Sequence, residues 1–292
     1  MPWEPPWYCG PMFESFSSVA ARYRVIFFDA YGVLKNSRGV PPEVPPVLAA
    51  LRDQGKQLFV LTNDASRPPA EMARGYADEV HGQLIGVEQL ISSGHLATEF
   101  LRDKVRDGLA AYLGQPGSAH FIEAAGLTPI PMRACRDTQP ELSAIVLLDD
   151  EGFDWFEDIN LTINLARRQN VPIVVANSDL AYPVGGHEVA VAIGSLANMI
   201  EGVLRKTLIH CGKPDAMMFN YAYLQAQAAD PTITKQDILM VGDTLATDIL
   251  GANKFGIDTA LVLSGTTQAS RAAALIEASG IIPSYLCESI FT

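Results

Sequence analysis

Residues 25–34 read Val-Ile-Phe-Phe-Asp-Ala-Tyr-Gly-Val-Leu, and this stretch decides the fold. Four large apolar residues lead into Asp29, and Gly32 follows three positions later. An apolar run bounded by turn residues is typical of a strand that is buried on both faces of a parallel sheet. Ligands of open α/β sheets bind outside the carboxyl ends of such strands, where Asp29 is expected to lie. A carboxylate there can attack a phosphorus or carbon centre or hold a cation, although an Asp in this place also caps turns and helices.

The composition predicts a full hydrophobic core and an acidic surface. The chain has 292 residues, of which 48% are apolar, so it is long enough for one large domain or two ordinary ones. Its formal net charge of −12 argues against nonspecific nucleic-acid binding and against an anionic membrane surface. An anionic substrate would therefore need cations that the site supplies locally, as Lys, Arg or a metal ion.

Neither a membrane span nor a secretory signal is expected. No apolar run approaches the length of a span, and residues 1–8 lack the basic-then-apolar order of a signal peptide. The four cysteines are scattered and form no Cys-x-x-Cys pair, which argues against a disulfide scaffold or a zinc site. Unpaired cysteines fit a reducing compartment, so we expect a cytoplasmic protein.

Apolar strands and amphipathic helices alternate at both ends of the chain. Strands are expected over 24–29, 58–61, 89–92, 238–241, 259–263 and 284–286, and helices over 13–22, 47–54, 68–80, 95–106 and 215–229, with a further helix ending at 255. Short loops between these elements predict right-handed parallel crossovers. We therefore predict that residues 1–107 and 205–292 form one doubly wound parallel sheet.

The middle of the chain is expected to form a second α/β unit over residues 108–204. Strands are expected over 120–122, 144–148, 171–176 and 189–193, a turn at Gly185–Gly186, and helices over 154–170 and 194–206. A unit of about a hundred residues is long enough to stand as a domain of its own.

Polar residues whose chemistry suits one site follow the expected strands of the larger domain, except for Lys213, which opens a helix. They are Asp29, Thr62, Asn63, Lys213, Asp243 and Asp248. In one parallel sheet these strand ends converge on one crevice. Three carboxylates in one place repel unless a cation lies among them, and a set of oxygen ligands suits Mg²⁺. The amine, hydroxyl and amide groups can hold phosphate oxygens, and phosphoryl transfer needs mainly such positioning and charge neutralisation.

Four ordered segments resemble the motifs of the haloacid dehalogenase-like hydrolase superfamily. They are Asp29-Ala-Tyr-Gly-Val-Leu, Leu61-Thr62-Asn63, Gly212-Lys213-Pro214 and Gly242-Asp243-Thr-Leu-Ala-Thr-Asp248, within a resemblance that covers about residues 24–266. The insertion at about 108–204 resembles the class IIA, C2-type cap of nitrophenylphosphatase-like and sugar-phosphate-phosphatase-like members. The resemblance implies a Rossmann-like core, a cap that closes over its carboxyl edge, and a homodimer.

The resemblance also implies residue roles in Mg²⁺-dependent hydrolysis of a small phosphate monoester, such as a sugar phosphate. Asp29 matches the nucleophile, which forms an aspartyl-phosphate that water then hydrolyses. Lys213 would tie the nucleophile to the phosphate. Substrate contacts are implied for Thr62 and Asn63 at the phosphoryl group, and for Asn177 and Asp179 in a cap loop, although Asn-Ser-Asp is also an ordinary turn.

A metal site is implied around the same nucleophile. Asp243 would ligate Mg²⁺ directly, together with Asp29 and the backbone carbonyl of Tyr31. Asp248 would support the metal-bound waters or Lys213.

Tyr31 departs from the phosphatase pattern. Family phosphatases carry a second Asp at this position, which protonates the leaving oxygen and later activates water. A phenol with a pKa of about 10 is a poor base near neutral pH, and loss of general acid–base catalysis costs on the order of 10²–10⁴ in rate. The sequence therefore predicts slow turnover, a preference for good leaving groups, or another acid, with His95, His187 and His210 as candidates.

Two alternative functions follow from the same residues. Asp-Ala-Tyr-Gly also resembles the first motif of L-2-haloacid dehalogenases, which attack carbon without a metal, but Asp243 and Asp248 form the acidic pair typical of the phosphatases. The loss of the second Asp is also compatible with a non-catalytic member that binds a phosphorylated ligand.

Overall fold

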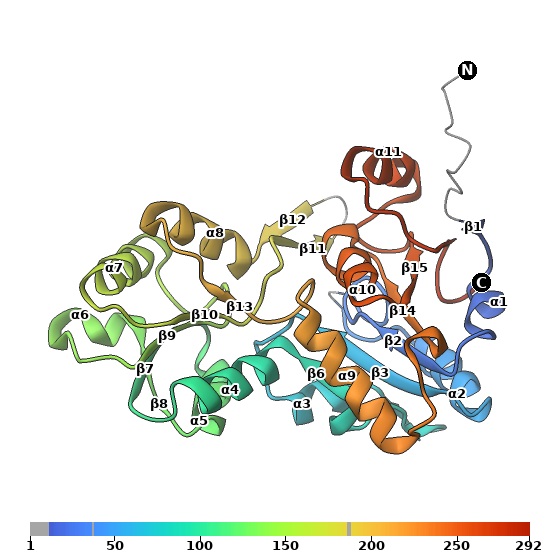
Figure 1. Ribbon diagram of the computed structural model, residues 1–292, viewed down its shortest axis with the longest axis horizontal. Coiled ribbons are helices and arrows are strands. Elements are labelled where there is room, and N and C mark those ends of the chain that lie inside the picture. Colours follow the sequence, from blue (N-terminus) through green and yellow to red (C-terminus); the bar gives the residue numbers. More distant parts are fainter. Residues whose placement is uncertain (1–11, 37, 186–187) are drawn as a thin grey trace.

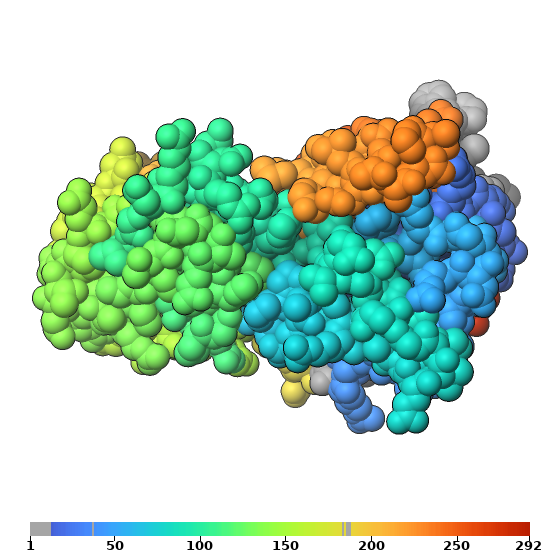
Figure 2. Space-filling model, turned by 90° about the horizontal axis from the view of Figure 1, so that it is seen from below, coloured from blue at the N-terminus to red at the C-terminus, as the bar shows by residue number. Residues whose placement is uncertain are grey.

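The computed structural model describes residues 12–36, 38–185 and 188–292, which form two lobes around two parallel sheets (Figure 1). One lobe combines the first and last parts of this chain, and the middle part forms the other. The two lobes also lie side by side when the molecule is seen from below (Figure 2). Parallel strands surrounded by helices confirm the predicted α/β class.

The larger sheet has seven strands in the order β1-β16-β15-β14-β2-β3-β6, and every neighbouring pair is parallel. The strands are β1 (Met12–Phe13), β2 (Val25–Phe28), β3 (Gln57–Thr62), β6 (Leu90–Ser92), β14 (Ile238–Gly242), β15 (Asp258–Val262) and β16 (Tyr285–Cys287). The chain runs outward from β2 through β3 to β6, then returns at β14 on the other side of β2. This is the predicted doubly wound topology, and ligands bind where the strand order reverses.

Helices cover both faces of this sheet, which explains why β2 is apolar at every position. Val25 and Phe27 point to one face and pack with α4 (Ser93–Lys104), α9 (Ala216–Ala229) and α10 (Leu250–Phe255). Ile26 and Phe28 point to the other face and pack with α1 (Phe16–Ala20), α2 (Val44–Asp53) and α3 (Pro69–Arg74). Successive strand side chains alternate between faces, so a strand that is covered on both sides shows no polar alternation.

The smaller sheet has five parallel strands in the order β13-β10-β9-β7-β8. They are β7 (Leu109–Leu113), β8 (Thr128–Pro131), β9 (Ala144–Leu147), β10 (Ile173–Val175) and β13 (Ile209–His210). Helices α5 (His120–Ala124), α6 (Cys135–Thr138), α7 (Trp155–Arg168) and α8 (Ile193–Leu204) accompany this sheet, and β11 (Ala181–Gly185) pairs with β12 (Glu188–Val191) in a separate antiparallel hairpin. Strand β13 lies beyond residue 204, so the smaller sheet extends past the predicted insertion.

Helix α7 shows how local sequence sets an element of the smaller lobe. The carboxylate of Asp154 accepts a hydrogen bond from the backbone N–H of Glu157 at 2.7 Å and so caps the helix. Acidic residues occupy its first turn and arginines its last turn, which is the charge order that the helix dipole favours.

Several predicted elements differ from those in the structure. The strand predicted over 120–122 is wrong: these residues begin helix α5, because a short apolar pair such as Phe121-Ile122 suits a helix as well as a strand. The helix predicted over 68–80 ends at Arg74, and a small hairpin of β4 (Ala77–Asp78) and β5 (Gly82–Gln83) follows. Strands β7, β8 and β13 were not predicted. The predicted turn at Gly185–Gly186 reaches outside the described residues.

Helix α11 (Ala269–Ser279) packs against β15 near the end of the chain. The three cysteines within the described residues, Cys135, Cys211 and Cys287, are free and buried. No helix in the described part of the chain is both long enough and apolar enough to cross a membrane.

Candidate active site

Asp29 lies directly after β2, at the point where the strand order reverses. Its backbone N–H donates to the carbonyl of Val241 at 2.9 Å, so the ladder between β2 and β14 continues to this residue. Gly32 has a φ of +81°, and a β-carbon built on it would lie 2.0 Å from Oδ2 of Asp243. Only glycine allows the turn after Asp29 to pass this close to the second carboxylate.

Asp243 and Asp248 follow β14, the strand next to β2. Oxygen atoms of Asp29, Asp243 and Asp248 lie within 4.8 Å of one another. A π-helical turn over Leu245–Ile249 carries Asp248 back to the strand end, where its Oδ2 accepts from the backbone N–H groups of Asp243 at 3.2 Å and Thr244 at 3.1 Å. The three carboxylates that the sequence predicted to converge therefore form one cluster.

This cluster is electrostatically costly without a cation. Burial raises the pKa of Asp29 well above its ordinary value, and the Asp248 carboxylate adds to that shift while Lys213 opposes it. Burial and the charge of Asp248 raise the pKa of Asp243 to about 6, although hydrogen bonds from Thr266 and Thr244 oppose the shift. A set of carboxylate oxygens in one buried place is the chemistry that a hard divalent cation requires, so the residues present fit Mg²⁺.

Lys213 bridges two of the acids from the buried side. Its Nζ atom lies 2.6 Å from Oδ1 of Asp29 and 2.7 Å from Oδ1 of Asp248, and the residue is only 2% exposed. Burial alone would lower the pKa of Lys213, but Asp248 and Asp29 outweigh it and the pKa is raised. Lys213 therefore stays protonated, and both oxygens of Asp248 are occupied by hydrogen bonds.

The predicted substrate residues after β3 occupy different environments. Thr62 lines the cavity described below, and its Oγ1 accepts from the backbone N–H of Asp64 at 3.2 Å. Asn63 is only 2% exposed, and its side chain instead binds the backbone of Lys213 and the carboxylate of Asp179. The amide of Asn63 is thus engaged with protein groups.

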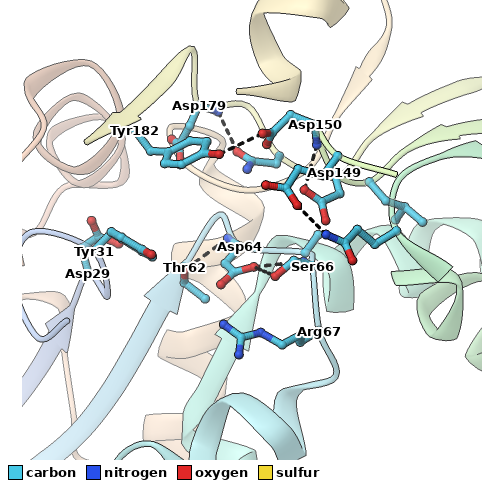
Figure 3. A pocket seen from close by; sticks show the side chains of 15 residues that line it. Asp29, Tyr31, Thr62, Asp64, Ser66, Arg67, Asp149, Asp150, Asp179 and Tyr182 are labelled. Carbon is cyan, nitrogen blue, oxygen red and sulfur yellow. Dashed lines mark hydrogen bonds between the residues drawn. The ribbon is translucent and has the colours of Figure 1, made fainter. Parts of the chain in front are cut away.

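A cavity of about 350 Å³ opens over Asp29 between the two lobes (Figure 3). The larger lobe lines it with Asp29, Tyr31, Thr62, Asp64, Ala65, Ser66 and Arg67, and the smaller lobe with Gln115, Leu148, Asp149, Asp150, Glu151, Asn177, Asp179 and Tyr182. Figure 3 shows Asp149, Asp150 and Tyr182 facing Thr62 and Asp64 across the cavity. Tyr31, Asn177 and Asp179 are therefore brought to the same place as the predicted nucleophile.

An ion pair that sequence reasoning missed lies beside Tyr31. The Nζ atom of Lys35 lies 4.6 Å from the ring centroid of Tyr31 and 3.0 Å from Oδ2 of Asp64. Burial would raise the pKa of Asp64, but Lys35 and hydrogen bonds from Ser66 outweigh it and lower that pKa. Asp64 is therefore held ionised, which makes it a poor proton donor.

The acidic wall of the smaller lobe was also missed. Asp149, Asp150 and Glu151 follow the buried strand β9, as Asp29 follows β2, and this pattern could have identified them. Burial and the charge of Asp150 raise the pKa of Asp149 to about 6. Tyr182 donates to Oδ2 of Asp150 at 3.0 Å.

The two described histidine candidates lie away from this cavity. His95 stacks edge-on against Tyr221, with 5.0 Å between ring centroids, and burial lowers its pKa. Nε2 of His210 lies 3.2 Å from Oε1 of Glu201. Neither His95 nor His210 lines the cavity over Asp29. His187 lies outside the described residues.

Family comparisons agree with this geometry. The family described as haloacid dehalogenase-like hydrolase matches residues 26–128, and a HAD-hydrolase-like family matches residues 210–290. Human chronophin is 30% identical over 280 residues, which cover 93% of this chain and 92% of chronophin. The chain therefore belongs to the haloacid dehalogenase-like hydrolases, and its relatives and structural neighbours place it in class IIA of that superfamily.

Individual relatives give the finer resemblance. A structure from Cytophaga hutchinsonii, described as a possible sugar phosphatase of the HAD superfamily, is 45% identical with a TM-score of 0.90 and covers 97% of this chain and 99% of its own. Glycerol-3-phosphate phosphatase from Gallus gallus is 26% identical over 309 residues, covering 95% of this chain and 93% of that protein. The p-nitrophenyl phosphatase from Archaeoglobus fulgidus, 18% identical with a TM-score of 0.76, shares the fold over 92% of this chain and 97% of its own.

Proposed function

We propose that this protein hydrolyses a small phosphate monoester with Mg²⁺ through an aspartyl-phosphate on Asp29. The observation that carries the proposal is the cluster of Asp29, Asp243 and Asp248 oxygens within 4.8 Å, with Lys213 2.6 Å from Asp29. One protonated lysine and a divalent cation would offset much of the negative charge of the acids and of an incoming phosphate. Relatives described as a possible sugar phosphatase and as a glycerol-3-phosphate phosphatase support the same reaction class.

Each residue has a role that follows from its contacts. Asp29, Asp243 and the carbonyl of Tyr31 would hold the metal, which supplies positive charge to the phosphoryl oxygens. Asp29 attacks phosphorus and displaces the alcohol oxygen, and water then cleaves the new acyl-phosphate bond, releasing phosphate and restoring the carboxylate. Lys213 holds Asp29 in position and offers charge to the phosphoryl group. Asp248 holds Lys213.

The phosphoryl group is proposed to rest against the end of β3. Thr62 presents its hydroxyl there, and the backbone N–H of Asn63 completes the contact. In the smaller lobe, Asn177 and Tyr182 contact the alcohol part of the substrate, since both line the cavity.

The charge of the cavity restricts the leaving group. Six carboxylate residues line it, against Arg67 alone among the lysines and arginines of its lining. An alcohol that carries a further negative charge is repelled by Asp149, Asp150 and Glu151, whereas hydroxyl or amine groups can donate hydrogen bonds to them. We therefore propose a neutral, hydroxyl-rich or cationic leaving group.

Three further expectations remain proposals. The unit at 108–204 acts as a cap over the active site and excludes water during reaction. A homodimer and a cytoplasmic location are proposed by analogy with class IIA relatives and from the free cysteines.

The test is phosphate release from a panel of phosphorylated metabolites and p-nitrophenyl phosphate with Mg²⁺. Asp29→Asn should reduce turnover by more than about 10³-fold, as loss of a nucleophile does. Asp103→Asn, the same change on an exposed face of α4, should leave turnover unchanged. Halide release from 2-chloropropionate in the presence of a chelator would instead favour a dehalogenase. Phosphate binding without any turnover would favour a ligand-binding protein.

A further inference from the structure

The side chain of Asn63 lies between Lys213 and the smaller lobe. Its Oδ1 accepts from the backbone N–H of Lys213 at 2.8 Å, and its Nδ2 donates to the backbone carbonyl of Lys213 at 2.9 Å. The same Nδ2 donates to Oδ1 of Asp179 at 2.9 Å. Asn63 therefore holds both backbone groups of Lys213 and is itself bound by a residue of the other lobe.

These partners fix which way the amide of Asn63 points. The carboxylate of Asp179 and the carbonyl of Lys213 can only accept hydrogen bonds, whereas the N–H of Lys213 can only donate. A flipped amide would place its oxygen against two acceptors and its NH₂ group against a donor. Asp179 thus reinforces the one orientation of Asn63 that satisfies the backbone of Lys213, and Asn63 itself is only 2% exposed.

Asp179 is itself held firmly in its loop. Its backbone N–H donates to Oδ1 of Asn177 at 2.8 Å, and its carbonyl accepts from the N–H of Gly194 at 3.1 Å, at the start of α8. A β-carbon on Gly194 would lie 2.5 Å from that carbonyl, so glycine is needed for this close contact. The position of Asp179 therefore follows the smaller lobe.

Lys213 is tied to the same lobe through the chain. Strand β13 pairs with β10 in the smaller sheet, and Lys213 follows three residues after its end. The loop that carries Asp179 leaves the neighbouring strand β10. Two adjacent strands of the smaller lobe therefore deliver Lys213 and the residue that orients its partner.

We propose that Asp179 is a positioning residue that fixes Lys213 against Asp29 through Asn63, so that the smaller lobe assembles the catalytic lysine. A substrate contact alone would not require a carboxylate here to bind a buried residue of the opposite lobe. Both Asp179 and Asn177 line the cavity, and Asn177 supports Asp179 by accepting a hydrogen bond from its backbone N–H. The kinetic part of the test rests on the proposed phosphatase function, and the structural part does not.

The kinetic test compares Asp179→Ala with Asp179→Asn on p-nitrophenyl phosphate with Mg²⁺. The alanine variant should lower kcat by tenfold to about 10²-fold, as small displacements of a catalytic group do, with little change in KM. The asparagine variant should keep most of the activity, because its amide oxygen can accept the same hydrogen bond. A raised KM with unchanged kcat would overturn the proposal, and so would an asparagine variant as slow as the alanine variant.

A reciprocal exchange tests the same contact without a change of size. Asn63→Asp should be slow, because two carboxylates would face each other, and adding Asp179→Asn should recover part of the loss by returning a donor to the pair. Ser195→Ala removes a hydrogen bond of 2.7 Å to the carbonyl of Leu180, next to Asp179, and should leave kcat unchanged. Failure of the double variant to exceed Asn63→Asp alone would contradict the proposal.

A crystal structure of Asp179→Ala gives a readout that needs no turnover. The ammonium of Lys213 should move away from its contacts of 2.6 Å and 2.7 Å with Asp29 and Asp248. An unchanged Lys213 in that structure would overturn the positioning role, even if the wild-type protein hydrolysed no phosphate ester. If the wild-type protein hydrolyses no phosphate ester but Lys213 is displaced in Asp179→Ala, this inference stands and only the proposed reaction is rejected.

Discussion

The Nζ atom of Lys213 lies 2.6 Å from Oδ1 of Asp29, although 184 positions of sequence separate the two residues. Strand β2, paired with β14, positions Asp29 at the edge of the larger sheet. Strand β13 of the smaller sheet leads into Lys213. The contact joins a buried cation to the carboxylate at the point where the strand order reverses. Its geometry, and that of the acids around it, leads to four predictions.

Mg²⁺ should stabilise the folded protein through the cluster of carboxylates. A ligand that binds only the folded state contributes about 2.7 kcal/mol at a concentration of 100 times its Kd. The melting temperature of chelator-treated protein should therefore rise when Mg²⁺ is added. Asp243→Asn should abolish that rise, whereas the exposed change Asp103→Asn should preserve it. An equal rise in both variants would place the ion elsewhere.

Tyr31→Asp should increase turnover by about 10²-fold. The new carboxylate would stand in the cavity with Asp29 and supply the general acid–base group that family phosphatases carry at this position. Measurement of kcat on a phosphate ester with a poor leaving group is the sharpest assay, because such groups depend most on protonation. Tyr31→Phe removes only the hydroxyl and should leave the rate unchanged. A slow Tyr31→Phe variant would show that the phenol already transfers protons.

Asp149→Asn should stabilise the protein above about pH 6. Burial and Asp150 raise the pKa of Asp149 in the folded state to about 6, so the folded protein binds this proton more tightly than the unfolded chain does. Stability therefore falls as pH rises from about 4 to about 6, and an amide avoids that loss. We expect a gain on the order of 1 kcal/mol at pH 7, because solvent screens this partly exposed group. Urea unfolding at pH 4 and pH 7 measures it; an equal effect at both pH values would contradict the assignment.

The charge of the leaving group should control specificity. Phosphoethanolamine should be hydrolysed with a kcat/KM at least about tenfold higher than 2-phosphoglycolate, since the second carries an extra carboxylate toward Asp149 and Glu151. Neutralising both acids, with Asp149→Asn and Glu151→Gln, should narrow that ratio. A preference for the anionic ester in the wild-type protein would rule out the proposed electrostatic selection.

Sequence alone was sufficient for those parts of the site that follow buried strands of the larger sheet. Asp29, Thr62 and Asp243 each come directly after an apolar run, so one rule about parallel sheets places all three at the same edge. The fold class and the doubly wound order follow from the same runs. Strand β7 reads Leu-Ala-Ala-Tyr-Leu, and its two alanines weaken the apolar signal, so this strand was missed.

The orientation of side chains between the lobes could not be read from the sequence. Asn63 belongs to a motif that suggested phosphate contact, yet its amide binds Lys213 and Asp179, which are distant in sequence. The strand-end pattern marks Asp149 and Asp150, but only the position of the smaller lobe over Asp29 shows that they belong to the same site. Such contacts depend on how the two sheets meet, and no local pattern encodes that arrangement.

The placement of β13 has a practical consequence for engineering. Because this strand is hydrogen-bonded into the smaller sheet and passes into Lys213, a chimaera spliced at residue 204 would combine a foreign sheet with the native edge strand. A poor fit between β13 and the foreign sheet would shift the ammonium group of Lys213. Grafts that exchange specificity between related enzymes should therefore carry residues through Gly212, together with the loop at 177–179, as one transplanted unit.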